Sequence, residues 1–499
     1  MPASGAEILV AIDVGTSGAR ATAFDLAGRQ QLEVRRGYPT ATPKPGWAEQ
    51  DPRAWRSASL AALADLVRRL GARRPVRAIG LTGQCPSVCL VDERGAPVST
   101  GLIYRDNRAT AEAAAIRERF GDVAIHARTG HLPAAFHVAP KLVWLKAHEP
   151  AAFVQAHRAL QPRDLVALAL TGEMATDGTH AAATLLFDIR HRAWTTDLRD
   201  ALGLPADLLP PLRPSSEILG GLTASAARRL GLPKELPVIL GGADSQACAL
   251  GAGVVAPGPV SEMAGSSTCL NTAVPEPLSV LEVTHFPHVV PGPFTTETGI
   301  NTTGAAVSWV ADLLYAPRGR RAGAADFARL DREVADVPAG SDGVLALSVL
   351  GDGERTDPDL RAAVTGLSLR HDRATVARAV LEGVAFAIRQ QLGLLTAAGR
   401  PVTELRISGG DTRLASWNRI KADVIGIPVV TVPGDAAVTG VAMLAGLGAG
   451  IYSSVEDAIR RCVSLERPIQ PDPATHAAYD ERFSAWRELA ASHVALREA

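Results

Sequence analysis

The chain has 499 residues, which is too long for one ordinary hydrophobic core and favours two or three domains. Its 51 basic and 52 acidic residues give a net charge of -1, which argues against binding nucleic acid or anionic membrane over the whole surface. With 47% hydrophobic and 21% charged residues, the chain can bury a core and does not belong to the disordered class.

Cysteine usage and the N-terminus indicate the compartment. Five cysteines in a chain of this length do not make a disulfide framework, and no two have the CxxC spacing of a zinc site. Residues 1–5 show no basic flank and no apolar region, so we expect no signal peptide. No apolar run reaches the ~18–20 residues that span a bilayer. These features predict a cytoplasmic protein.

A β-hairpin is the first predicted feature. Residues 8–13 form a β-branched apolar run that ends in Asp13, and a second run at 19–25 follows a Gly-hydroxyl turn at 15–18. A helix is predicted over 53–70, because its apolar residues recur on one stripe. Further strands are expected at 76–81 and 88–92, and further helices near 107–119, 140–147 and 163–170. This alternation is typical of an α/β fold.

A proline-rich seam at 203–237 divides the sequence and holds one clear helix, around 223–231. After the seam, a second strand–turn–strand unit at 260–272 repeats the N-terminal hairpin pattern. The repetition suggests two similar α/β domains that face each other across a cleft. A chance pair of Gly-Ser turns is the alternative interpretation.

Near the C-terminus, a predicted strand at 405–408 runs into Gly409 and Gly410, and a helix that ends near Gly426 follows. A strand, a glycine turn and a helix start can present backbone N–H groups to a phosphate. Two more helices are predicted, over 373–398 and 440–447.

Six motifs occur in an order that resembles the FGGY family of carbohydrate kinases, and most of all its xylulokinase and pentulose-kinase side. They are Ile-Asp-Val-Gly-Thr-Ser-Gly at 12–18, Pro-Gly-Trp-Ala-Glu-Gln-Asp-Pro at 45–52, Ala-Pro-Lys-Leu-Val-Trp-Leu at 139–145, Leu-Thr-Gly-Glu at 170–173, Gly-Gly-Ala-Asp at 241–244 and the segment 365–384. The resemblance implies two actin-like (ribonuclease-H-like) α/β domains facing across a nucleotide and sugar cleft. It places the N-terminal domain at 6–241 and the C-terminal domain at 242–499.

The resemblance also implies ATP and Mg²⁺ as cofactors and assigns two catalytic carboxylates. Asp244 corresponds to the general base that accepts the proton of the attacking hydroxyl. Asp13 corresponds to the residue that holds Mg²⁺, directly or through water. The plainer interpretations are a turn cap for Asp13 and a helix N-cap for Asp244.

Phosphate and nucleotide contacts are implied at glycine-rich turns in both halves, where the backbone can approach a phosphate closely. For Arg20, a solvated position on a strand is the alternative. The family often has a third glycine after Gly410, whereas this chain has Asp411, which puts the adenosine contacts and the nucleotide preference in question. The implied contacts are Gly15, Thr16, Ser17, Arg20, Gly265, Ser266, Ser267, Gly304, Gly409, Gly410 and Asp411.

Sugar contacts are implied at Gln84, Cys85, Asp106 and Asp244. The segment Gln84-Cys85-Pro86 departs from the family pattern, because the histidine that xylulokinases carry there is missing. Asp106 could instead be a solvated N-cap of the 107–119 helix. Packing or a surface position is the expected role of the other marked residues, which are Trp47, Cys89, His131, His137 and Trp144.

The sequence therefore predicts ATP-dependent phosphorylation of a small sugar hydroxyl, with a ketopentose such as xylulose or ribulose as the acceptor. Two alternatives stay open: a glycerol or other polyol kinase, and a non-kinase member that binds sugar or nucleotide. The expected partner is a small sugar or polyol, with no nucleic acid and no membrane, and a homodimer is left open.

Overall fold

A computed structural model describes residues 7–71, 74–351, 353–354 and 360–498. The leader prediction for residues 1–5 and the predicted domain ends at Ala6 and Ala499 lie outside these residues. The chain forms two compact units, each made of several segments. Unit 1 comprises Met1–Val255, Val274–Thr296 and Ala436–Val463, and unit 2 comprises Ala256–Ala273, Glu297–Asp435 and Ser464–Ala499. The predicted boundary between residues 241 and 242 stays a prediction.

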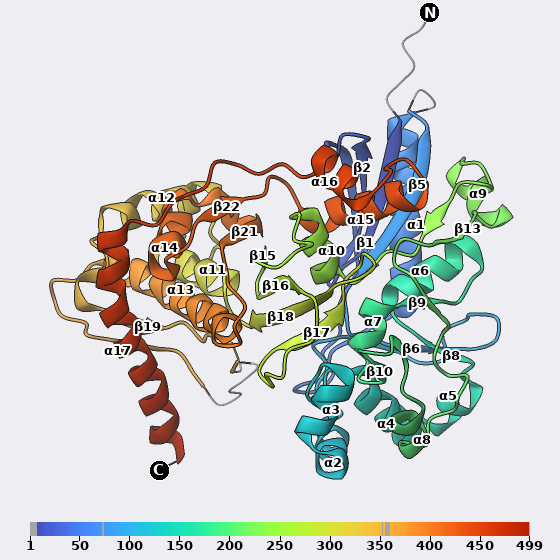
Figure 1. Cartoon of the computed structure of the whole chain (residues 1–499), viewed down its shortest axis with the longest axis horizontal. Helices are drawn as coiled ribbons and strands as arrows, with labels where there is room; N and C mark the ends of the chain where they lie inside the picture. The colour runs from blue at the N-terminus through green and yellow to red at the C-terminus, as the bar shows by residue number, and fades with distance from the viewer. Residues whose placement is uncertain (1–6, 72–73, 352, 355–359, 499) are drawn as a thin grey trace, which may run out of the picture. The chain divides into compact units, whose positions relative to one another are not determined.

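A six-stranded mixed sheet forms the centre of unit 1 (Figure 1). Its order is β13(Ile218–Gly220)-β14(Val238–Ile239)-β5(Val76–Gly83)-β1(Ile8–Val14)-β2(Gly18–Asp25)-β3(Gln30–Gly37). The predicted hairpin is confirmed, because β1 and β2 pair antiparallel with Asp13 opposite Arg20. β5 pairs with β1 in parallel, so the last residues of the two strands, Gly83 and Val14, lie side by side.

Side chains of β1 alternate between two apolar clusters, so both faces of the sheet are covered. Ile8, Val10 and Ile12 pack with α1(Pro52–Leu70), α6(Pro162–Thr171) and α9(Ala224–Leu230). Leu9 and Ala11 pack with α10(Asp244–Gly251) and α15(Ala436–Gly448) on the other face. The helix predicted over 440–447 is thus α15, a core helix of unit 1.

The remaining elements of unit 1 are short. The helices are α2(Thr110–Phe120), α3(Asp122–Thr129), α4(Val138–His148), α5(Pro150–Gln155), α7(Gly178–Ala182), α8(Thr196–Ala201) and α16(Val455–Cys462). Two-stranded pairs are formed by β4(Glu49–Gln50) with β7(Gly101–Leu102), β6(Cys89–Val91) with β8(Arg158–Leu160), β9(Thr176–Asp177) with β12(Leu212–Arg213) and β10(Phe187–Asp188) with β11(Ala193–Trp194).

A second six-stranded sheet has the order β17(Thr284–Pro287)-β18(Phe294–Ile300)-β16(Thr268–Val274)-β15(Pro259–Ala264)-β21(Glu404–Gly409)-β22(Val429–Thr431). The second predicted hairpin is confirmed, because β15 and β16 pair antiparallel. β21 joins β15 in parallel, as β5 joins β1. Taken along the chain, β15, β16, β18, β21 and β22 occupy the places of β1, β2, β3, β5 and β14, so the sequence repetition reflects a repeated topology.

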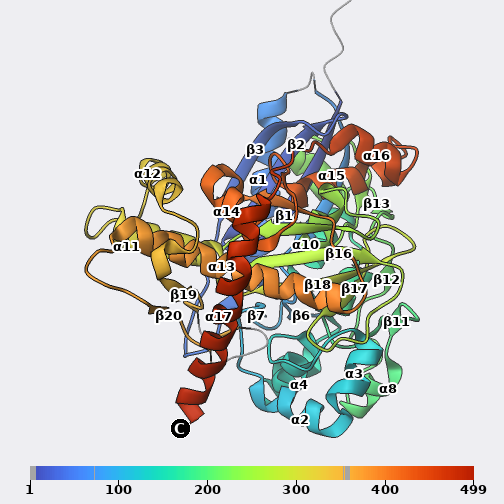
Figure 2. The ribbon, with the colours of Figure 1, turned by 60° about the vertical axis from the view of Figure 1, so that its left-hand side comes forward.

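Long helices dominate unit 2. The helix α17(Pro473–Glu498) contacts both α13(Arg373–Ala397) and α14(Ala415–Ile425), and it crosses α13 in Figure 2. The other elements are α11(Gly304–Leu314), α12(Ala324–Asp336), the pair β19(Leu345–Leu347) with β20(Ala363–Thr365), and the 3-10 turns Ser341–Gly343 and Gly410–Arg413.

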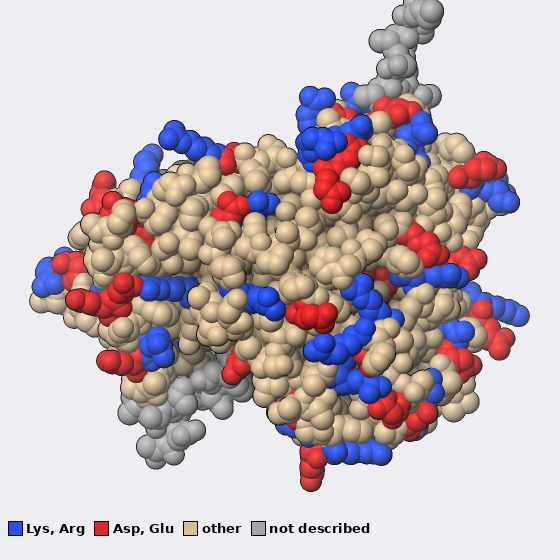
Figure 3. Space-filling view, viewed as in Figure 1, with Lys and Arg blue, Asp and Glu red and all other residues tan. Residues whose placement is uncertain are grey.

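Charged side chains of both signs are interspersed over the face of the molecule that Figure 3 shows. Within the described residues, no helix combines the length and the apolar character that crossing a membrane requires.

Candidate active site

The β1–β2 turn of unit 1 has its peptide groups held from several sides. Tyr38 and Gln84 donate to Gly15 O, and Gln50 Nε2 donates to Thr16 O at 2.7 Å. Burial, and after it the nearby Asp13 carboxylate, raises the pKa of Tyr38, so its hydroxyl stays protonated and keeps donating. A turn with fixed peptide dipoles is the arrangement that a phosphate-binding nest requires. Sequence reasoning missed Tyr38, which no motif marked.

Asp13 and Arg20 face each other on neighbouring strands. Arg20 Nε donates to Asp13 Oδ2 at 3.0 Å, and Arg20 Nη1 lies 3.9 Å from Glu33 Oε2. Both side chains of the Asp13–Arg20 pair are about 15% exposed, so Arg20 is not a solvated strand residue. Its predicted phosphate contact stays a prediction.

The carboxylate of Asp13 fits a magnesium ion that has few protein ligands. Within the described residues, no group of three or more His, Cys, Asp or Glu side chains could hold a metal. Magnesium in phosphoryl-transfer sites is typically held by one or two carboxylates together with substrate phosphates and water. The single half-buried carboxylate beside the turn is compatible with an ion that arrives bound to the nucleotide.

Asp244 is the first residue of α10 and is half-buried. Its Oδ1 accepts a hydrogen bond from Ser245 N at 2.8 Å. Ala243, not Asp244, is the N-cap of this helix, so the N-cap interpretation of Asp244 is wrong. The two glycines before it are needed: Gly241 has φ +74°, and a Cβ there would overlap Leu81 O.

Gln84 and Cys85 come directly after β5, which is the strand that pairs with β1. Gln84 Nε2 donates to Gln50 Oε1 at 2.9 Å, whereas Gln84 Oε1 has no hydrogen-bond partner among the described residues. Burial, and then the charge of Asp244, raises the pKa of the Cys85 thiol. The thiol is therefore protonated.

Asp106 is completely buried, so it is neither solvated nor the cap of α2, whose N-cap is Ala109. Its Oδ2 accepts from Ala48 N at 2.6 Å, and Arg108 donates to both carboxylate oxygens. Arg108 also reaches Glu49 at 2.6 Å and covers the ring of Trp47 at 3.7 Å. A direct sugar contact of Asp106 stays a prediction, and it would have to compete with these bonds.

Lys141 connects the two loops to which sugar contacts are assigned. It is fully buried on α4, and its Nζ donates to Ile103 O at 2.7 Å and contacts Pro86 O at 3.4 Å. Burial lowers the pKa of Lys141 to about 7. The sequence carried a signal for this, because Lys141 stands inside an otherwise apolar helical segment, but its role was not predicted.

In unit 2, the turn between β15 and β16 packs against the start of α11. Gly304 N donates to Gly265 O at 3.1 Å, and both Thr303 N and Ala305 N donate to Ser266 O. The Thr268 and Thr303 hydroxyl oxygens lie 2.8 Å apart. The structure thus brings together the predicted contacts at 265–267 and Gly304.

Gly409 lies at the same end of this sheet, since it pairs with Ala264, the last residue of β15. The predicted order of strand, glycine turn and helix ending near Gly426 is confirmed. The turn is the 3-10 turn Gly410–Arg413, and α14 begins at Ala415 with Leu414 as its N-cap. Asp411 lies within that turn, and the nucleotide contacts of Gly409, Gly410 and Asp411 stay predictions.

The residues expected to pack do so. His137 Nδ1 lies 2.8 Å from Ala183 O, and the ring of buried His131 faces His137 and Phe286. Trp47 and Trp144 contact each other edge to face at 5.5 Å. Cys89 is buried and free, whereas Cys85 is free and only partly buried.

Comparison with known proteins identifies the class as two-domain carbohydrate kinases. Residues 8–251 match the N-terminal domain of the FGGY family of carbohydrate kinases, and residues 261–449 match its C-terminal domain. The chain therefore belongs to the FGGY family of carbohydrate kinases, and it is an enzyme of the sugar-kinase type.

Relatives with three different acceptors are similar over almost the whole chain. A xylulose kinase of Bacillus subtilis (strain 168) is 28% identical, with 96% of each chain covered. An autoinducer-2 kinase of Escherichia coli (strain K12) is 31% identical, with 96% of this chain and 93% of that protein covered. A glycerol kinase of Leptothrix cholodnii is 32% identical, with 94% of each covered.

The fold agrees with the same family. The crystal structure of a xylulose kinase from Rhodospirillum rubrum has a TM-score of 0.91 and 33% sequence identity, and covers 99% of this chain and 100% of its own. The predicted α/β fold of two actin-like, ribonuclease-H-like domains is confirmed by this match and by the two family domains.

Proposed function

We propose that this carbohydrate kinase transfers the γ-phosphoryl group of ATP to a hydroxyl of a ketopentose such as xylulose or ribulose, with Asp244 as the general base. The observation that supports this assignment of the base is the position of the Asp244 carboxylate. This carboxylate is half-buried and belongs to the first residue of α10, directly after a glycine loop whose backbone is tightly bound. The xylulose kinases among the relatives support the choice of acceptor.

In the proposed reaction, Asp244 takes the proton of the acceptor hydroxyl as its oxygen attacks the γ-phosphorus, and the bond from that phosphorus to the β–γ bridging oxygen of ATP breaks. The phosphoryl group moves to the sugar, and ADP leaves with the electron pair of the broken bond. Peptide N–H groups of the turns at 15–17 and 265–267 donate to phosphate oxygens as negative charge develops. Gln84 Oε1 accepts a hydrogen bond from a sugar hydroxyl.

Asp13 would hold Mg²⁺, directly or through water. When bound, the ion offsets the charge of the nucleotide phosphates. Arg20 keeps the Asp13 carboxylate in place through its 3.0 Å bond. The cytoplasmic location and the homodimer stay predictions.

Glycerol and other small polyols form the second class of acceptor, since a glycerol kinase and autoinducer-2 kinases are 31–32% identical to this chain. The absence of the xylulokinase histidine beside Cys85 favours a test of both classes, because one lost hydrogen-bond partner can change the accepted sugar.

The test is ADP release from MgATP with a panel of ketopentoses, aldoses, polyols and glycerol, measured for the purified chain and for Asp244→Asn. We expect ADP release with a ketopentose, and a loss of about 10²–10⁴-fold in kcat for Asp244→Asn with ATP binding retained. Asp122→Asn is the matched control, because Asp122 is likewise the first residue of an eight-residue helix.

Near-normal turnover of Asp244→Asn would show that Asp244 is not the base. ADP release with glycerol alone would show that the acceptor belongs to the second class, glycerol and other small polyols. If no acceptor in the panel stimulates ADP release, the result would be evidence for the non-kinase alternative.

A further inference from the structure

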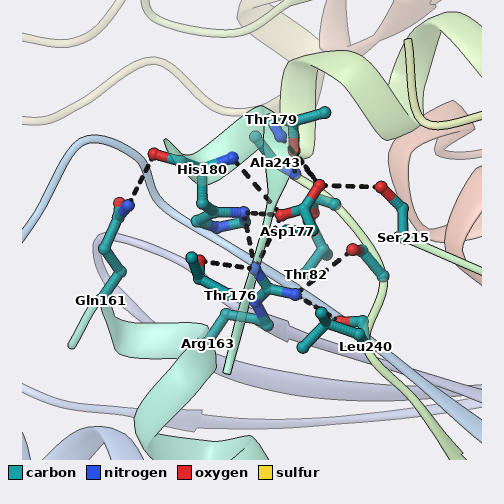
Figure 4. A network of polar contacts seen from close by, with 12 residues as sticks. Thr82, Gln161, Arg163, Thr176, Asp177, Thr179, His180, Ser215, Leu240 and Ala243 are labelled. Carbon is teal, nitrogen blue, oxygen red and sulfur yellow. Dashed lines mark hydrogen bonds and ion pairs between the residues drawn. The ribbon is translucent and has the colours of Figure 1, made fainter. Parts of the chain in front are cut away.

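A network of buried polar side chains lies beneath the loop that precedes Asp244 in unit 1 (Figure 4). Its members come from distant segments: Arg163 from the first turn of α6, Asp177 from the end of β9, and Thr179 and His180 from α7. Their side chains are at most 1% exposed. Apolar side chains of similar volume are often as stabilising as a buried ion pair, so stability alone does not account for such a network.

Asp177 is the centre of this network. Its Oδ1 accepts from Arg163 Nη2 at 2.8 Å and lies 2.8 Å from His180 Nδ1. Its Oδ2 accepts from the hydroxyls of Thr179 at 2.7 Å and Ser215 at 2.8 Å. Burial by itself raises the pKa of Asp177, but Arg163 and His180 outweigh this effect and hold the pKa below its usual range. Asp177 is therefore ionised and orients both Arg163 and Thr179.

Arg163 and Thr179 connect the network to the backbone of residues 240–243. Arg163 Nη1 donates to Leu240 O at 2.6 Å and to Gly241 O at 3.2 Å. Ala243 N donates to Thr179 Oγ1 at 2.8 Å. Thr82, on β5, completes the set, because its hydroxyl donates to Gly242 O at 2.7 Å.

The loop is closely packed at Gly242. A Cβ there would lie 2.5 Å from Val289 Cγ1 and 3.2 Å from Thr179 Oγ1, so a larger residue would press on Val289 and on the network. The next residue after the held segment is Asp244, whose direction is set by the peptide groups that precede it.

We propose that Thr179, Asp177 and Arg163 are positioning residues that hold the 240–243 backbone and thereby aim the Asp244 carboxylate at the acceptor hydroxyl. The inference rests on the proposed function, because it takes Asp244 as the base. Thr179 is the decisive link, since its hydroxyl donates to Asp177 and accepts from Ala243 N at the same time.

The test compares Thr179→Val with Thr179→Ser, using MgATP and the acceptor that gives the fastest ADP release. Valine keeps the shape but removes both hydrogen bonds, whereas serine keeps the hydroxyl. We expect Thr179→Val to lower kcat by about 10- to 100-fold through misplacement of the base. Thr179→Ser should restore kcat to within about threefold, and KM for MgATP should change by less than about twofold in both variants.

Thr195→Val serves as the control for the loss of a buried threonine hydroxyl. Thr195 is 1% exposed, and its hydroxyl donates to Leu186 O instead of touching the loop. We expect its melting temperature to fall as that of Thr179→Val does, with kcat unchanged.

Three results would overturn the inference: normal kcat in Thr179→Val, no recovery in a folded Thr179→Ser, or an equal loss of kcat in Thr195→Val. Asp244→Asn separates this inference from the proposed function. If Asp244→Asn turns over normally, the base assignment itself fails. If it is inactive while Thr179→Val is normal, only the positioning role fails.

Discussion

Lys141 is an ionisable group whose burial makes it sensitive to pH near neutrality. Its amine is enclosed between the Pro86 and Ile103 carbonyls, and burial lowers its pKa from 10.5 to about 7. In the unfolded chain the same amine keeps its proton up to about pH 10. Between these two pKa values, the unfolded state therefore binds one more proton than the folded state.

This difference predicts that the Lys141 contribution to stability rises with pH above 7. The gain approaches about 1.4 kcal/mol per pH unit, because stability increases with pH wherever the unfolded state binds more protons. The measurement is urea unfolding of the natural chain and of Lys141→Met between pH 7 and 8.5. The difference between their free energies of unfolding at each pH gives the Lys141 contribution. The difference cancels the thiols and tyrosines that titrate at higher pH, and a pH-independent difference would contradict the lowered pKa.

At the scale of single residues, the sequence could predict which side chains are chemically interesting but not how they are bonded. Asp13 and Asp244 stand in short motifs, so their positions could be predicted. The network at Asp177 could not, because its members lie as far apart in sequence as Thr82 and Ala243, and only the folded chain brings them together. Asp106 shows the reverse case. Its motif suggested a ligand contact, whereas in the structure its carboxylate forms an ion pair with Arg108.

At the scale of elements, the crossing of α10 and α15 is unusually close. A Cβ at Gly440 would clash with Ala247 O, and a Cβ at Gly251 would clash with Ala436 O. The two helices therefore meet backbone to backbone. Since Asp244 begins α10, the position of this carboxylate depends on the glycines of the crossing.

We expect Gly440→Ala to destabilise the protein by about 1–3 kcal/mol, because one added methyl group overpacks this contact, and to lower kcat by displacing α10. Thermal unfolding and ADP release measure the two effects. Gly393→Ala is the control: Gly393 lies in α13, and a Cβ added there would meet no atom of the described residues within 4 Å, so this change should stabilise by about 0.5–1 kcal/mol. Equal stability of the two variants would contradict the close crossing.

Elements with a strong apolar period could be predicted from the sequence, as α1 and α13 show. The short elements α3, α7 and α8 could not, because eight residues or fewer hold too little periodicity to separate a helix from a loop. The turn after Gly409 could be predicted, but its 3-10 geometry could not, because glycines are compatible with several turn geometries and packing selects among them.

At the scale of the whole molecule, neither unit is a continuous stretch of chain. Unit 1 takes α15 and α16 from residues 436–463, long after the chain has entered unit 2. Val438, Val441 and Leu444 of α15 cover Leu9 and Ala11 of β1. A gene fragment that ends at Val255 keeps α10 but lacks α15, and so loses part of the cover of one face of its central sheet.

We expect the fragment 7–255 to expose this apolar face and to fail to fold cooperatively. Binding of a hydrophobic dye, together with the loss of a sharp unfolding transition, would show it, and the full chain is the control. Adding residues 436–463 through a flexible linker should restore the transition. A cooperatively folded 7–255 fragment would contradict the role assigned to α15.

The position of α15 near the end of the chain also affects the order of folding during biosynthesis, because α15 is synthesised long after β1. At about 5–20 residues per second, a ribosome needs on the order of 20–90 s to reach residue 436. Throughout that interval the Leu9 face of the sheet lacks α15 and has at most α10 as its helical cover. The first strand to be made is thus among the last to be enclosed, and the growing chain offers holdase chaperones an apolar surface until translation is nearly complete.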